Sequence, residues 1–146
     1  MKYLIMALLL LTAASSNLNA ADGKPLVTSA AHKAFERSFK NASEVSWTEA
    51  NNVYKVEFLF NSQYNIAYYN ASGALITLEK NIVSTQLPLI LEANLKTRYA
   101  GFWITSLQEF SNDKKVSYTI KLENAFSKLV LRSSGTGWIL VQKTLK

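Results

Sequence analysis

The chain has 146 residues, with 16 Lys and Arg against 10 Asp and Glu, one His and no Cys. Its length predicts a single domain, and its 49% hydrophobic and 18% charged content excludes a disordered, charge-extended chain. The missing Cys excludes disulfides and thiolate chemistry, and a single His excludes zinc sites built on paired His and disfavours a His-dependent catalytic triad.

Residues 1–20 have the three-part layout of a secretory signal peptide. A basic start at Met1–Tyr3 precedes an uncharged, Leu-rich run from Leu4 to Ala14, and small residues stand at Ala20–Ala21. A membrane-spanning helix needs about 20 apolar residues, so this run is too short to be one. We therefore predict cleavage after Ala20 and a mature chain, residues 21–146, that is periplasmic or secreted and keeps no integral membrane segment.

A first repeat, about residues 27–82, begins with an amphipathic helix. Its apolar residues recur every four positions: Val27, Ala31, Phe35 and Phe39. Thr28 or Ser29 is the expected N-cap, and Asn41 is expected to end the helix in a left-handed conformation.

The period then changes to two, which is typical of half-buried antiparallel strands. The alternating apolar residues are Val45 and Trp47, followed by Tyr54, Val56, Phe58 and Phe60. Turn-forming residues at 51–52 separate the first two strands. Turns at 61–62 and 70–73 then lead into two further strands, Tyr64–Tyr69 and Ala74–Leu78. We therefore predict a β-meander after the helix.

A second repeat, about residues 87–146, has the same order of elements. Its helix has Pro88 at the first helical position, a stripe every four residues, and Gly101 as a left-handed cap; the stripe is Leu87, Leu91, Leu95 and Tyr99. Four strands are predicted to follow, within residues 102–110, 116–122, 126–132 and 138–141.

The two repeats match at an offset of 64 residues. The matched pairs are Phe35/Tyr99, Phe39/Trp103, Tyr54/Tyr118, Val56/Ile120, Phe58/Leu122, Ile66/Val130, Gly73/Gly137 and Leu75/Ile139. We predict an α+β fold in which two tandem helix–meander repeats form one antiparallel sheet with both helices on one face. The opposite face, here called the open face, is then exposed to water or a partner.

One feature of the second repeat leaves its strand register open. Lys128 and Arg132 stand where the first repeat has Tyr64 and Tyr68. A shift by one residue would reverse the faces, and Leu129 and Leu131 would then point inward.

Three segments resemble the PepSY-like family of small exported bacterial proteins. They are Tyr54–Phe58, Ala67–Gly73, and Leu87–Pro88 opening a helix that ends at Tyr99. The similarity covers about residues 28–143 and consists of hydrophobic fold motifs. It implies an α+β domain with tandem repeats, related in fold to the β-lactamase-inhibitor protein, and an inhibitor-like or binding role. It supplies no catalytic residues.

The residues themselves give little support for catalysis. His32 and Glu36 lie one helical turn apart and are interpreted as solvated surface; Glu49 and Glu57, imaginable as glycosidase carboxylates, have no independent support. The carboxylates form no Ca²⁺ or Mg²⁺ pattern, and no phosphate loop or nucleophile elbow is present. We expect no enzyme, no catalytic or metal-ligating residues and no cofactor.

The charge is unevenly distributed along the mature chain. Residues 21–95 carry a net charge of −1, whereas residues 96–146 carry +6. This asymmetry hints at an anionic partner, although a solubilising surface charge is the favoured interpretation. No basic run exceeds two residues, so a nucleic-acid partner is not expected.

The 17 aromatic residues exceed the needs of one small core. Trp and Tyr dominate interface hot spots, so we name candidate binding residues: Trp47, Tyr69, Trp103, Lys121 and Trp138. Each Trp is otherwise explained as core. Tyr68 and Tyr69 are adjacent and must lie on opposite faces, and Lys55, Thr119 and Lys121 are expected on the open face.

The leading hypothesis is an exported module that docks a protein or peptide of the cell envelope on its open face. Its oligomeric state is left open. One alternative is a structural envelope protein without a specific ligand. Another is a small-molecule or lipid carrier, which needs a cavity that bulky side chains would fill: Phe35, Phe39, Phe58 and Phe60.

Overall fold

The computed structural model describes residues 27–146, so the predicted signal peptide and the first residues after it lie outside the described part. The elements follow the predicted order: α1 Ser29–Ser38, β1 Ser43–Ala50, β2 Val53–Phe60, β3 Gln63–Asn70, β4 Leu75–Asn81, a 3-10 helix η1 Ser84–Gln86, α2 Leu89–Arg98, β5 Trp103–Ser111, β6 Val116–Glu123, β7 Ser127–Ser134 and β8 Gly137–Leu145. Neither α-helix within residues 27–146 has the length and apolar content that a membrane crossing requires.

The eight strands form one antiparallel sheet in chain order, β1 to β8. Two-residue turns connect the first strands, and all four turn residues have positive φ: 52° at Asn51, 61° at Asn52, 52° at Asn61 and 61° at Ser62. Such turns match the right-handed twist of a hairpin, and Asn tolerates this conformation better than most residues. Local turn chemistry therefore produces the predicted meander.

Both helices pack on the same face of the sheet. On the first half of that face, Val56 of β2 pairs with the buried Ala67 of β3. On the second half, Leu107 of β5 pairs with the buried Ile120 of β6. The strand pairing from β2 to β6 carries one set of side chains through the sheet, so α1 and α2 share this face, here called the helix face. The predicted fold class is confirmed.

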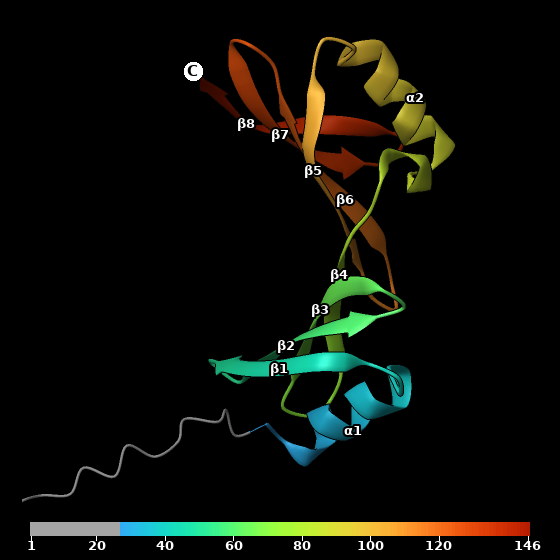
Figure 1. The fold of residues 1–146 in the computed structure, drawn as a ribbon, viewed down its shortest axis with the longest axis vertical. Coiled ribbons are helices and arrows are strands. Elements are labelled where there is room, and N and C mark those ends of the chain that lie inside the picture. The colour runs from blue at the N-terminus through green and yellow to red at the C-terminus, as the bar shows by residue number, and fades with distance from the viewer. Residues whose placement is uncertain (1–26) are drawn as a thin grey trace, which may run out of the picture.

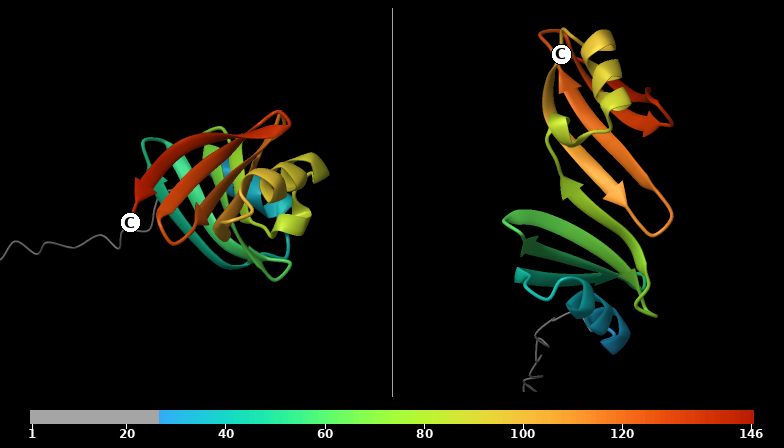
Figure 2. Two further views of the ribbon diagram at one scale, coloured as in Figure 1. Left: turned by 90° about the horizontal axis from the view of Figure 1, so that it is seen from above. Right: turned by 90° about the vertical axis from the view of Figure 1, so that its right-hand side faces the viewer.

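Residues 27–146 form two hydrophobic cores, one in each repeat. The first is mainly aromatic, with Phe35 of α1 lying 4.9 Å from Phe58 between ring centroids. The second is mainly aliphatic, with Leu91 and Leu95 of α2 packed over β5–β8. The halves are joined where β4 pairs with β5 over four residues of each strand. Figures 1 and 2 show the resulting elongated shape, with α1 at one end of the long axis and α2 beside the strands of the other half.

The helix ends differ from the prediction except at one N-cap. Thr28 caps α1 as predicted, because its hydroxyl accepts a hydrogen bond from the amide of Ala31 at 3.2 Å. The expected left-handed ends at Asn41 and Gly101 are wrong. The helices are instead capped by Phe39 (φ −132°) and Tyr99 (φ −129°), whose carbonyls accept from amides three residues later. These turns redirect the chain without a left-handed residue. The start of α2 also differs, because Pro88 precedes the helix as its N-cap.

The offset of 64 holds for the second and third strands of each repeat, β2–β3 and β6–β7. Trp47 of β1 pairs with Val56, nine positions on, whereas Leu107 of β5 pairs with Ile120, thirteen positions on. The β5–β6 hairpin is therefore four residues longer, and the matches Phe35/Tyr99 and Phe39/Trp103 are wrong.

The helices and first strands correspond at an offset of 60 instead, and Phe39 and Tyr99 both cap their helix. The matches of Gly73 with Gly137 and of Leu75 with Ile139 also fail. Gly73 has φ +82°, and in the second repeat the left-handed glycine is Gly135, with φ +55°. Leu75 pairs with Tyr69 on the helix face, whereas Ile139 pairs with Arg132 on the open face.

The open question about the second repeat is resolved by burial. Leu129 and Leu131 point inward and are buried. Their equivalents at the offset of 64, Asn65 and Ala67, are buried as well, so no register shift separates the repeats. Lys128 and Arg132 therefore lie on the open face at the places of Tyr64 and Tyr68.

Candidate functional site: the open face of the sheet

No helix or strand among residues 27–146 packs on the open face. Pairing and alternation place Lys55, Thr119 and Lys121 there, as predicted. The prediction for the adjacent tyrosines also holds: Tyr69 is 2% exposed on the helix face, and Tyr68 lies on the open face opposite Lys55.

Three of the five candidate binding residues lie on the helix face. Tyr69 is buried, and the loss of solvent around its phenol raises its pKa to about 12. Trp47 is half-buried with its ring 5.4 Å from that of Phe35, and Trp138 is 7% exposed. The prediction that these three residues dock a partner on the open face is therefore wrong. Packing against α1 and α2 uses these rings for the cores.

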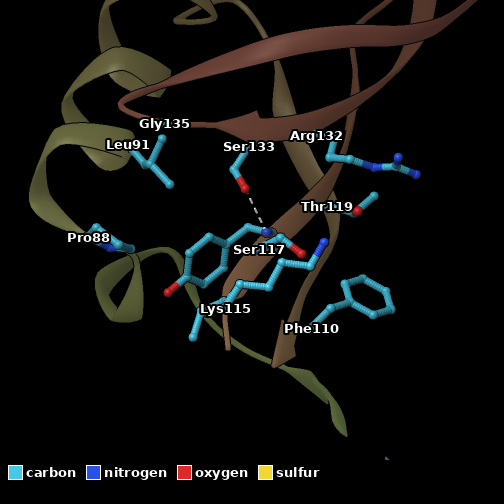
Figure 3. A pocket seen from close by; sticks show the side chains of 11 residues that line it. Pro88, Leu91, Phe110, Lys115, Ser117, Thr119, Arg132, Ser133 and Gly135 are labelled. Carbon is cyan, nitrogen blue, oxygen red and sulfur yellow. Dashed lines mark hydrogen bonds between the residues drawn. The ribbon is translucent and has the colours of Figure 1, made fainter. Parts of the chain in front are cut away.

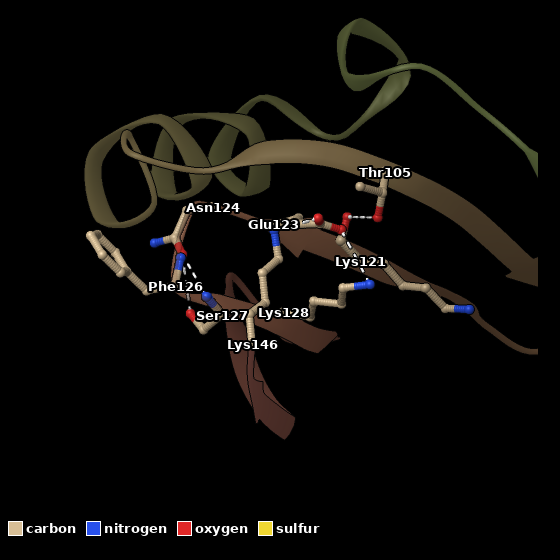
Figure 4. Close-up of polar contacts among 8 residues, drawn as sticks. All are labelled: Thr105, Lys121, Glu123, Asn124, Phe126, Ser127, Lys128 and Lys146. Carbon is tan, nitrogen blue, oxygen red and sulfur yellow. Dashed lines mark hydrogen bonds and ion pairs between the residues drawn. The ribbon is translucent and has the colours of Figure 1, made fainter.

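Trp103 and Lys121 lie on the open face. Trp103 is 52% exposed and pairs with Glu123 across β5 and β6. The ammonium of Lys146 lies 5.3 Å from the centroid of the Trp103 ring and 2.6 Å from the carboxylate of Glu123. This hydrogen bond lowers the pKa of Glu123, which Lys128 also approaches at 3.8 Å (Figure 4). A binding role for Trp103 and Lys121 stays a prediction.

An apolar stripe runs along β3 on the open face. Tyr64, Ile66 and Tyr68, here called the β3 stripe, stand at every second position and are at least partly exposed. The Tyr64 hydroxyl donates a hydrogen bond to the carboxylate of Glu44, which raises the pKa of Tyr64. Glu44 itself occupies a left-handed conformation (φ 53°) in the β1 irregularity. The bulge thus anchors one end of the stripe.

Phe110 of β5 places an aromatic side chain on the open face of the second half. It pairs with Glu79 of β4, and Glu79 pairs with Ile66 of the β3 stripe. The Glu79 carboxylate accepts a hydrogen bond from the side-chain amide of Gln108 at 2.5 Å. Ile66 and Phe110 therefore lie on the same face at the joint between the repeats, with the Glu79 carboxylate between them.

Beyond Phe110 the sheet divides between β6 and β7. Regular pairing of these strands ends at Thr119 and Arg132. Beyond this pair, the Tyr118 amide donates a hydrogen bond to the Ser133 hydroxyl at 2.8 Å, in place of a backbone carbonyl of β7. The strands separate there and leave a pocket of about 630 Å³, which is lined by open-face residues and also by Pro88 and Leu91 at the start of α2. Figure 3 shows Lys115, Thr119 and Arg132 grouped on one side of it, above Phe110.

Several open-face residues were missed by the sequence reasoning. Tyr64 and Phe110 lacked a named role, and Arg132 was noted only as a mismatch with Tyr68. The repeat offset contains the missing signal, because it assigns Lys128 and Arg132 to the same face as Tyr64 and Tyr68. The second repeat thus carries cations where the first carries aromatic rings.

The alternative functions need catalytic groups, metal ligands or a cavity for a small molecule. His32 and Glu36 lie 3.4 Å apart on exposed α1 surface, and no three of the His, Asp and Glu side chains in residues 27–146 gather as metal ligands. Between α1 and the sheet, four Phe rings pack together with contacting centroids 4.6 to 5.5 Å apart: Phe35, Phe39, Phe58 and Phe60. Beside α2 a hollow of about 350 Å³ opens to solvent between Glu92, Lys96 and apolar side chains.

Comparison with known proteins supports the fold. A protein of the DUF2874 family from Bacteroides ovatus has a TM-score of 0.68 at 16% identity, over 80% of this chain and 86% of that one. A BLIP-like protein from Bacteroides fragilis gives 0.67 at 15%, over 84% and 89%. A Bacteroides eggerthii protein, inferred to be periplasmic, gives 0.70 at 8%, over 83% and 90%.

No model of a known family matches the chain, and no curated protein matches it either. At these identities the structural neighbours show the fold alone. The expected relation to the β-lactamase-inhibitor-protein fold is confirmed, and membership of the PepSY-like family stays a prediction.

Proposed function

We propose that this chain is an exported, non-catalytic module that docks a protein or peptide of the cell envelope across its open face. The observation that carries the proposal is the character of that face. The β3 stripe, Phe110 and Trp103 are large apolar or aromatic side chains, and no described helix or strand covers them. Exposed apolar surface rimmed by polar groups is typical of interaction sites, and aromatic residues are frequent binding hot spots.

Two further observations support an envelope location and an inhibitor-like role. Residues 1–20 have the layout of a secretory signal peptide. The structural neighbours include a protein inferred to be periplasmic and another called BLIP-like. Inhibition would follow if docking on the open face covered the partner's active site.

The test is capture of partners from an envelope extract by immobilised residues 21–146, washed at low and then high salt. Two double variants remove similar apolar surface from opposite layers of the molecule. Tyr64→Ser/Tyr68→Ser alters the β3 stripe, and Leu89→Ser/Ile90→Ser alters exposed residues of α2. Equal urea midpoints of all three proteins provide the folding control.

We expect a partner that survives high salt on the wild type and on the α2 variant but is lost from the β3-stripe variant. Loss from the α2 variant alone would place binding on the helix layer and contradict the proposal. If the wild type retains nothing at either salt, a structural envelope role without a specific ligand would explain the fold better.

A further inference from the structure

We propose that the second half of the open face binds the carboxylates of an acidic, extended segment of the docked partner. Four cationic side chains form the site and are here called the basic strip: Lys115, Lys121, Lys128 and Arg132. This inference rests on the proposed function and adds to it the chemistry of the partner.

The residues of the basic strip lie on β6 and β7 or next to them, and they line two hollows in the surface. Lys121 of β6 pairs with Val130, two positions from Arg132 on β7, so Lys121 and Arg132 are diagonal neighbours on one face. Lys115 and Arg132 line the pocket where β6 and β7 separate. Lys121 and Lys128 line a second groove of about 400 Å³, which Glu123 lines as well. The cations are therefore beside concave surface that can receive a ligand.

The positive charge of the strip is poorly compensated within the described residues. Lys115, Lys121 and Arg132 form no ion pair with any residue between 27 and 146. Lys128 approaches Glu123 only at 3.8 Å, whereas Lys146 is 2.6 Å from the same carboxylate.

The first half of the open face is different. There the Lys55 ammonium forms an ion pair with the neighbouring Glu57 carboxylate, and that hydrogen bond raises the pKa of Lys55. Neighbouring cations that outnumber the acids beside them repel one another, and a bound anion relieves that repulsion.

The spacing of the strip fits an extended peptide. Diagonal neighbours on a sheet lie roughly 7–8 Å apart, and alternate side chains of an extended strand roughly 6.5–7 Å apart. Acidic residues at alternate positions of a peptide would therefore meet Lys121 and Arg132 in turn. The hydroxyls of Ser117 and Thr119 line the same pocket and can donate to carboxylates, and Phe110 supplies an apolar contact beside them.

The experiment measures binding of a fluorescein-labelled peptide of about ten residues that alternates Glu and Thr, by fluorescence anisotropy. The same peptide with Gln in place of Glu is the neutral control, and salt is varied from about 0.02 M to about 0.3 M. Lys121→Gln/Arg132→Gln is compared with Lys33→Gln/Arg37→Gln on exposed α1, which removes the same charge from the opposite layer.

We expect the Glu peptide to bind the wild type at low salt and to lose affinity about tenfold with Lys121→Gln/Arg132→Gln. The α1 variant should lose less than about twofold, since Lys33 and Arg37 lie on the opposite layer and contribute only to the net charge of the protein. Equal losses in both variants, or equal binding of the Gln peptide, would overturn the inference. So would strip-dependent binding to phosphatidylglycerol vesicles without binding of the Glu peptide, because the ligand would then be a lipid headgroup.

This result is independent of the capture test. If the Glu peptide fails to bind while a captured partner still depends on the β3 stripe, the acidic partner chemistry is wrong and docking on the open face stands. If the peptide binds but the β3-stripe variant captures as the wild type does, docking through the stripe is wrong.

Discussion

The indole N–H of Trp138 donates a hydrogen bond to the backbone carbonyl of Leu91 at 3.0 Å. This bond ties β8, the last strand of the sheet, to the first turn of α2, and Trp138 is only 7% exposed. The ring is thus a structural connection between the helix layer and the edge of the sheet.

Trp138→Phe should destabilise the protein by about 1–3 kcal/mol, because it removes a buried donor and leaves the Leu91 carbonyl without that partner. Trp103→Phe, at a site 52% exposed, should cost less than about 0.5 kcal/mol. Urea unfolding followed by circular dichroism measures both. Similar costs for the two variants would contradict the structural role of Trp138.

Gly73 lies where the β3–β4 turn meets the start of α1. It has φ +82°, and a Cβ there would be 2.5 Å from the carbonyl oxygen of Ala30. Gly73→Ala should therefore cost more than about 2 kcal/mol, since the conformation is strained and the obstacle is backbone. Gly101→Ala meets nothing within 4 Å and should be nearly neutral. Equal thermal midpoints of the two variants would exclude this close approach.

Burial raises the pKa of Tyr69 to about 12, against about 10 in the unfolded chain. The neutral phenol is favoured in the folded state, so its contribution is fully present below pH 10 and is lost as pH rises through 12. The stability of the wild type should fall relative to Tyr69→Phe by about 2–3 kcal/mol over this window. Urea unfolding at several pH values measures the difference. Tyr68→Phe, on the open face, should leave the decline in place; its disappearance there would contradict the assignment.

The Ser133 hydroxyl connects β6 and β7 at the point where their regular pairing ends. Ser133→Ala removes the acceptor of the Tyr118 amide and should cost about 1–2 kcal/mol. Hydrogen exchange of the Tyr118 amide should become faster in this variant. Ser134→Ala, at an exposed neighbour, is the control, and equal protection of Tyr118 in both variants would show that the hydroxyl does not hold the strands.

The architecture could be predicted because the hydrophobic periods of the strands and of the helices indicate the same buried face. Period two in residues 54–58 and period four in the helices place apolar side chains on one sheet face and one helix stripe. Hairpin length could not be predicted in the same way. Four extra residues between Leu107 and Ile120 change no hydrophobic pattern, and they displace the match of both helices.

The candidate site was harder to predict because local sequence does not assign faces to aromatic runs. Tyr68 and Tyr69 are equally aromatic, and the pairing of Tyr69 with Tyr54 decides which is buried. Trp138 precedes the continuous apolar run 139–141, where no alternation indicates its side. Charged residues carried a clearer signal, since Lys121 was correctly placed on the open face.

The most direct test of docking on the open face is site-specific photo-crosslinking in the native host. A benzophenone amino acid is placed at Ile66 or Thr119 on the open face, and at Lys33 or Ala93 on the exposed surface of α1 or α2. We predict that ultraviolet light gives the same protein adduct from both open-face sites and none from the helix sites. Adducts formed only from the helix sites would contradict the account, and so would equal adducts from both layers.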